Sequence, residues 1–127
     1  MQNRIEDSIL KNLFVSDTFT RKVIPYLEED YFTDRSERLV YKQIGEYFMK
    51  YNECPTHEAL SIQINDLSGH NDEEIKNALT VVNQCKTNTE ETPHDFLVDE
   101  TEKWCKDRAI YNACLLYTSP SPRDVSS

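Results

Sequence analysis

The chain has 127 residues, of which 38% are hydrophobic and 29% charged, a balance that predicts a folded, soluble domain with one modest core. Its net charge of −9 argues against a nucleic-acid-binding surface as the main function, because phosphate contacts require clustered lysine and arginine. No apolar run approaches the ~20 residues that span a bilayer, and the N-terminus lacks the apolar core of a signal peptide, so we expect a cytoplasmic protein with no membrane partner.

Helical spacing of the apolar residues predicts an all-α fold, a small bundle of about five helices. Only two glycines are present, which leaves little material for tight hairpins. A first short amphipathic helix is expected over residues 5–14, and a second over residues 19–27 after a cap at Ser16. The acidic turn Glu28–Asp30 then leads into the pair Tyr31–Phe32, which we expect to plug the core.

The stretch from Tyr31 to Leu60 carries the clearest helical pattern. Asp34 and Glu37 have the D-x-x-E form of a capping box, in which each side chain accepts a hydrogen bond from a backbone N–H at the helix start. Cys54-Pro55-Thr56 ends the helix, because the residue before a proline is pushed away from helical dihedral angles. Thr56 can cap the next helix. The expected core residues are Phe32, Val40, Ile44, Tyr47, Phe48 and Leu60.

Two further helices complete the predicted bundle of residues 1–92. The fourth helix places Leu60 and Ile64 on one face and stops near Gly69, a plausible residue just past a helix end. The fifth helix opens at Asn71, where Glu74 completes a second capping-box pattern. A sixth helix starts at Thr92-Pro93, with proline at the first helical position, where its missing N–H costs nothing.

The predicted sixth helix, residues 93–113, has a thin and interrupted apolar stripe, and charged residues cover the rest of its surface. Such a helix either lies across the domain or projects to meet a partner. A tryptophan is as common in a core as at an interface, so the stripe alone leaves both interpretations open. The residues of the stripe, which are the candidates for a partner interface, are Leu97, Thr101, Trp104, Arg108 and Tyr111.

No pattern in the chain predicts a catalytic residue, a cofactor site or a metal site. Gly45 and Gly69 are the only glycines, so the phosphate-binding loop G-x-x-x-x-G-K-[ST] is absent. The three histidines stand singly, without an i+4 partner, which favours surface or cap positions over metal ligation. The four cysteines lack C-x-x-C spacing, which favours buried thiols over a zinc site or a disulfide framework.

Residues 114–127 are expected to be a non-native tail. The eleven residues 114–124 resemble the in-frame translation of a transposase-type sequencing adapter, and a natural Ser/Pro linker is the alternative. We therefore exclude everything after Ala113 from the fold prediction. We expect that the natural protein continues past this point and is truncated here.

Six segments of the chain form a recognisable set. They are Val23–Leu27, Asp30–Phe32, Leu39–Tyr41, Tyr51–Thr56, Val98–Trp104 and Arg108–Ala113. No single motif is diagnostic, whereas the order and spacing of the whole set are fairly specific. In this order and spacing the chain, from about residue 9 to residue 113, resembles the N-terminal domain of replicative DnaB-family helicases, in particular the phage branch.

The resemblance implies a helical bundle followed by a projecting helical hairpin, of which residues 93–113 are the first arm. In that family such domains pair through their hairpins into a collar on a hexameric ring, and the collar docks primase. The implied partners are therefore other helicase subunits and primase. ATP, magnesium and most DNA contacts belong to a motor domain further along the parent chain, so this segment is not itself expected to be an enzyme. A return arm beyond Ala113 would complete the thin stripe, which gives Trp104 an interface role.

Two other functions stay open at this stage. One is a small acidic all-α phage protein that binds and inhibits a host factor, and the other is an enzyme fragment whose chemistry depends on an absent part. The continuing reading frame discriminates among the three. A phosphate-binding loop in a following domain supports the helicase, whereas a stop codon shortly after Ala113 supports the small protein.

Overall fold

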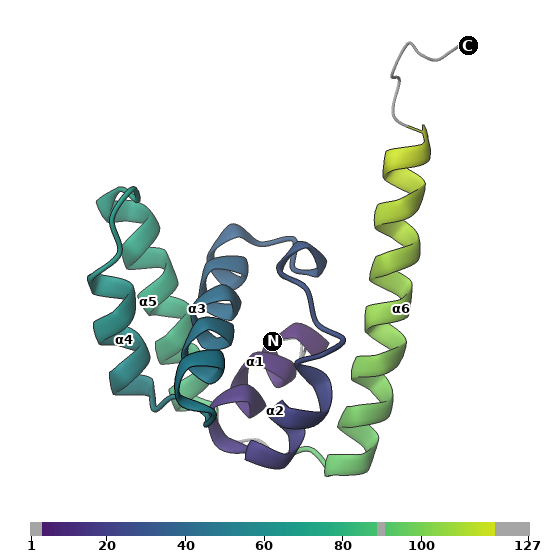
Figure 1. The fold of residues 1–127 in the computed structure, drawn as a ribbon, viewed down its shortest axis with the longest axis horizontal. Coiled ribbons are helices and arrows are strands. Elements are labelled where there is room, and N and C mark those ends of the chain that lie inside the picture. The colour runs from purple at the N-terminus through teal and green to yellow at the C-terminus, as the bar shows by residue number, and fades with distance from the viewer. Residues whose placement is uncertain (1–3, 89–90, 119–127) are drawn as a thin grey trace.

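Helices make up the architecture of this chain, for which the computed structural model describes residues 4–88 and 91–118 (Figure 1). Over these ranges the chain forms six α-helices and one 3-10 helix, with no strand, which confirms the all-α prediction. The helices are α1 (Ile5–Val15), α2 (Asp17–Val23), η1 (Glu29–Tyr31, the 3-10 helix), α3 (Arg35–Tyr51), α4 (His57–Asn65), α5 (Asp72–Thr87) and α6 (His94–Thr118).

The helices pack as two groups that share α1. On one side α3, α4 and α5 contact one another, and on the other side α6 contacts α2 and η1. Helix α1 contacts members of both groups and therefore lies at the centre of the bundle (Figure 1). The far end of α6 extends past the other helices.

Side-chain caps begin three helices where the sequence predicts them. The Ser16 hydroxyl accepts a hydrogen bond from Phe19 N at 3.2 Å, and the Thr56 hydroxyl accepts one from Ala59 N at 3.0 Å. Asn71 forms the complete capping box with the third residue of α5. These caps satisfy backbone donors that have no partner inside the helix.

The capping box predicted at the start of α3 is half wrong. The Asp34 carboxylate accepts hydrogen bonds from the backbone N–H groups of Ser36 and Glu37, at 2.8 and 3.2 Å. The Glu37 side chain does not return to the cap. It is buried and forms an ion pair with Arg4, which precedes α1. A buried carboxylate gains more from a cation than from a backbone N–H that water can reach.

Two predicted helix ends also differ. Helix α2 ends at Val23 rather than near Leu27, because Pro25 has no N–H to continue the bonding pattern, and Tyr26 N instead bonds Val23 O at 2.9 Å. Helix α4 ends at Asn65, before the expected stop near Gly69. Gly69 instead takes a left-handed conformation, with φ 83°, in the connection to α5.

The sixth helix begins one residue later and ends beyond the predicted limit. Pro93 lies just before α6, and its carbonyl accepts the first helical hydrogen bond, from Leu97 N at 2.9 Å. Helix α6 continues to Thr118, past the boundary expected at Ala113. Residues 119–124 of the adapter-like segment lie outside the described residues.

The core of the bundle forms where α1 and α3 meet the remaining helices. Phe32, Val40, Ile44 and Leu60 are completely buried in it. Tyr47 and Phe48, which were expected in the core, are only half-buried near the C-terminal end of α3. Each fully buried apolar side chain of this size contributes about 1.5–3 kcal/mol. The other fully buried apolar side chains are Ile9, Leu10, Leu13, Phe19, Val23, Ile64, Ala78 and Leu97.

Candidate functional site

The first half of α6 belongs to the core of the bundle. Leu97, Thr101 and Cys105, at helical spacings of four, are 1%, 0% and 5% exposed. They face inward because this part of α6 contacts α1, α2 and η1. The expectation that the stripe requires a partner helix is therefore wrong for Leu97 and Thr101. A narrow stripe suffices here because it enters a groove between several elements, rather than lying on one flat face.

Trp104 packs the middle of α6 against the segment that follows α2. Its ring centroid lies 5.1 Å from that of Phe32 and 6.1 Å from that of Tyr31, the latter pair edge to face. Phe32 in turn stacks on Tyr41 at 5.3 Å. The Tyr41 hydroxyl donates to Leu27 O at 3.1 Å, and burial raises the pKa of Tyr41 to about 12. Half-buried Trp104 thus packs α6 against its own domain, and the interface role that the resemblance implied for it stays a prediction.

The remaining stripe residues lie in the second half of α6. Arg108 is half-buried, and its guanidinium carbon lies 4.8 Å from the ring centroid of Tyr111. Tyr111 is 51% exposed, and Ile110 beside it is 63% exposed. We call Arg108, Ile110 and Tyr111 the distal surface of α6. Asn112 Nδ2 donates to Asp30 O at 3.4 Å, so α6 still contacts the bundle at this point.

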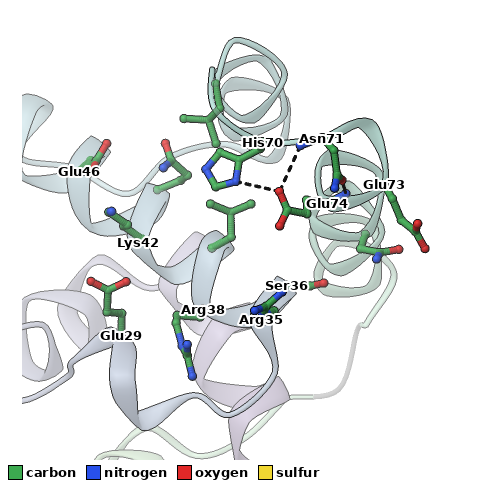
Figure 2. A pocket seen from close by; sticks show the side chains of 14 residues that line it. Glu29, Arg35, Ser36, Arg38, Lys42, Glu46, His70, Asn71, Glu73 and Glu74 are labelled. Carbon is green, nitrogen blue, oxygen red and sulfur yellow. Dashed lines mark hydrogen bonds and ion pairs between the residues drawn. The ribbon is translucent and has the colours of Figure 1, made fainter.

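A hollow of about 540 Å³ lies away from α6, between α3 and the start of α5 (Figure 2). The half-buried side chains of Leu39 and Leu67 contribute apolar surface to it. Charged side chains come from both helices: Arg35 and Lys42 from α3, and Glu73 from α5. We call this hollow the α3–α5 cleft. Its residues come from segments far apart in the sequence, so no local pattern predicts it.

His70 occupies the middle of the α3–α5 cleft in Figure 2, at the end of the connection from α4. Its Nδ1 lies 3.3 Å from Glu74 Oε1, and the same oxygen accepts a hydrogen bond from Asn71 N at 3.1 Å. The hydrogen bond from the Asn71 N–H lowers the pKa of Glu74 below its usual value, and the contact with His70 adds a smaller effect in the same direction. His70 is therefore a cap-region histidine, as predicted.

Three cysteines and one histidine are wholly or partly buried in the bundle. Burial raises the pKa of Cys85 to about 12 and of Cys105 to about 11, so both thiols stay protonated at neutral pH. The Cys54 thiol is half-buried and donates to the Thr20 hydroxyl at 3.2 Å. His57 stacks on the Phe14 ring at 4.4 Å, and burial lowers its pKa.

Residues 4–88 and 91–118 contain neither a metal cluster nor a membrane-spanning helix. No group of three His, Cys, Asp or Glu side chains comes close enough together there to hold a metal ion. Among the helices described, none combines the length and the apolar character needed to cross a bilayer. The features that remain are surfaces: the distal surface of α6 and the α3–α5 cleft.

Comparison with known proteins gives one relationship. No protein-family profile matches the chain. A DnaB-like replicative helicase of Enterobacteria phage T4 is 29% identical to it over 105 residues, which are 83% of this chain and 22% of the helicase. The chain thus spans about a fifth of the length of the relative that it matches. It is distantly related to a replicative DNA helicase.

Proposed function

We propose that this chain is the assembly and primase-docking domain at the N-terminus of a replicative DNA helicase. In this proposal the domain holds helicase subunits together and does not itself unwind DNA. The observation that carries the proposal is the two-part character of α6, whose first half is enclosed in the core while Ile110 and Tyr111 remain exposed. A helix that is fixed at one end and exposes apolar side chains at the other is suited to pairing with a helix of another subunit.

The distal surface of α6 has the residue types that dominate protein interfaces. Tyrosine and arginine are enriched among the side chains whose loss costs most binding energy. The Arg108 guanidinium rests on the Tyr111 ring, an arrangement that reduces the freedom of both side chains before a partner arrives. Pairing then loses less conformational entropy than it would with two mobile side chains.

The charge and chemistry of the chain support a positional role. A net charge of −9 disfavours extensive contact with DNA phosphates. The proposal therefore assigns ATP, magnesium and the main DNA contacts to a motor domain of the parent protein. The subunits are proposed to pair through α6 within a hexamer, and the resulting collar is proposed to recruit primase.

The test is made in the full-length helicase that carries this segment. The double variant Ile110→Asp/Tyr111→Asp introduces charge on the distal surface without disturbing the core, because both side chains are exposed. We expect light scattering to show loss of the hexamer at concentrations where the wild type is fully assembled. The matched control is Met49→Asp, on α3, where the side chain is 80% exposed and outside the proposed interface.

Primase binding is measured on the same proteins by analytical ultracentrifugation. We expect the variant to lose co-sedimentation of primase together with the ring, while Met49→Asp retains both. A hexamer of unchanged stability in the double variant would refute the role of α6. If the wild-type protein forms a normal ring that does not retain primase, the docking role is refuted while the assembly role stays intact.

A further inference from the structure

The α3–α5 cleft is lined by charges of both signs. Arg35 and Lys42 line it from α3, and Glu46 and Glu73 line it from α3 and α5. In the part of the chain that the structure describes, none of these four takes part in an ion pair. Figure 2 shows the basic side chains on one helix and Glu73 on the other.

Other charges around the cleft are already engaged. Arg38 donates from Nε and Nη2 to Phe32 O, at 3.2 and 3.0 Å. Glu74 caps α5 and contacts His70. These interactions fix the rim, so the charges left for a ligand are those of Arg35, Lys42, Glu46 and Glu73, together with Glu29.

The charge pattern selects among possible ligands. A free anion such as phosphate would lie close to several carboxylates, and a small apolar ligand would desolvate charged groups without pairing them. A ligand that carries acidic and basic groups around an apolar centre pairs both kinds of charge and covers Leu39 and Leu67. An amphipathic protein helix offers this combination, because side chains three or four residues apart share one face.

We propose that the α3–α5 cleft docks an amphipathic helix of a partner protein, with an apolar side chain over Leu39 and Leu67. One flank of that helix carries acidic side chains, which meet Arg35 and Lys42. The opposite flank carries basic side chains, which meet Glu73 on α5. A hollow of about 540 Å³ is within the size range of ligand pockets, about 300–1,000 Å³, and receives side chains of the docked helix rather than the whole helix.

This inference deepens the docking part of the proposed function and rests on it, whereas it does not involve α6. The two surfaces are separate, since no residue of α6 lines the cleft. Failure of the cleft would leave subunit assembly untouched, and failure of assembly through α6 would leave binding to the cleft measurable. Oligomeric state and cleft binding are therefore recorded on the same samples.

The experiment uses the present chain, labelled with ¹⁵N, and three synthetic helical peptides that share one leucine stripe. The first peptide has glutamates on one flank and lysines on the other, the second has glutamates on both flanks, and the third has lysines on both. Binding is followed by amide chemical shifts. We expect the mixed peptide to bind most tightly and to shift the amides of residues 35–46 and 67–77.

Charge reversal of the basic wall then tests the pairing. Arg35→Glu/Lys42→Glu alters two exposed side chains, so the fold should be retained. We expect the variant to bind the mixed peptide about tenfold more weakly, because two attractions become repulsions. It should bind the all-lysine peptide more tightly than the wild type does, a gain that misfolding cannot produce. The matched control, Lys22→Glu/Lys50→Glu, changes the net charge equally outside the cleft and should leave binding of the mixed peptide unchanged.

Three outcomes would overturn the proposal. The first is the absence of shifts at the cleft amides with the mixed peptide. The second is equal binding of the mixed and all-glutamate peptides, which would make the cleft a simple receptor for acidic groups. The third is concentration-dependent shifts of the cleft amides in the chain alone, which would assign the cleft to a second copy of this chain.

Discussion

Replacement of Leu97 by alanine tests whether the first half of α6 is part of the core. Leu97 is 1% exposed, and Leu→Ala changes at buried sites cost about 2–5 kcal/mol. The side chain also borders a hollow of about 620 Å³ between α1, α5 and α6, into which water can enter after truncation. We therefore expect a loss toward the middle of that range, about 3 kcal/mol. This is a large fraction of the ~5–15 kcal/mol that stabilises a typical domain.

Urea and thermal unfolding, followed by circular dichroism, measure this loss. For a domain of this size about 3 kcal/mol corresponds to a fall of roughly 10 °C in melting temperature. Ile110→Ala is the matched control, because it removes aliphatic atoms from the same helix at a position 63% exposed. Its effect should stay within about 0.5 kcal/mol. Equal losses in the two variants would refute the asymmetric seating of α6.

Two further predictions concern the helix starts. Burial raises the pKa of Glu37 from 4.5 to about 7. Between these pH values the folded chain therefore binds more protons than the unfolded chain. The stability of the wild type should consequently fall as pH rises through this window. Glu37→Gln keeps an acceptor for Arg4 and should remove this dependence, so its stability relative to wild type should rise as pH increases through this window. Parallel pH profiles of the two proteins in urea unfolding would contradict this prediction. Asn71→Ala removes the cap of α5 and frees Glu74, so it should cost about 0.5–2 kcal/mol. Amide exchange in the first turn of α5 should accelerate, whereas the mid-helix control Asn83→Ala should leave it unchanged; equal acceleration in both would show that the cap is not the cause.

Local sequence patterns predicted the features that depend on neighbouring residues. The caps at Ser16, Thr56 and Asn71 each join residues three apart, so a short stretch contains the whole interaction. The ion pair of Arg4 with Glu37 joins residues 33 apart. No pattern around Glu37 reveals that partner, and the D-x-x-E motif points to a different one.

The functional surfaces were less predictable, for a physical reason. The stripe of α6 looked too thin for a core because Thr101 and Cys105, which are small and only weakly hydrophobic, add little to the hydrophobic periodicity of the helix. They are instead fully or almost fully buried, since small side chains allow α6 to approach its neighbours closely. The α3–α5 cleft has its apolar surface from Leu39 and Leu67, which only the packing of separate segments brings together. The sequence left two alternatives for Tyr111, packing across the domain or exposure toward a partner, and could not choose between them.

Because the first half of α6 is buried and its distal surface is exposed, a small tilt of the helix produces a larger displacement at its far end. Leu97 and Tyr111 are 14 residues apart in one continuous helix, a span of about 21 Å at 1.5 Å per residue. A tilt of about 10° at the buried end therefore moves the exposed end by about 4 Å. Trp104, the single tryptophan of the chain, lies midway between these two residues and packs against Phe32. Trp104 fluorescence should therefore report a displacement of the far end of α6, such as one caused by a bound partner.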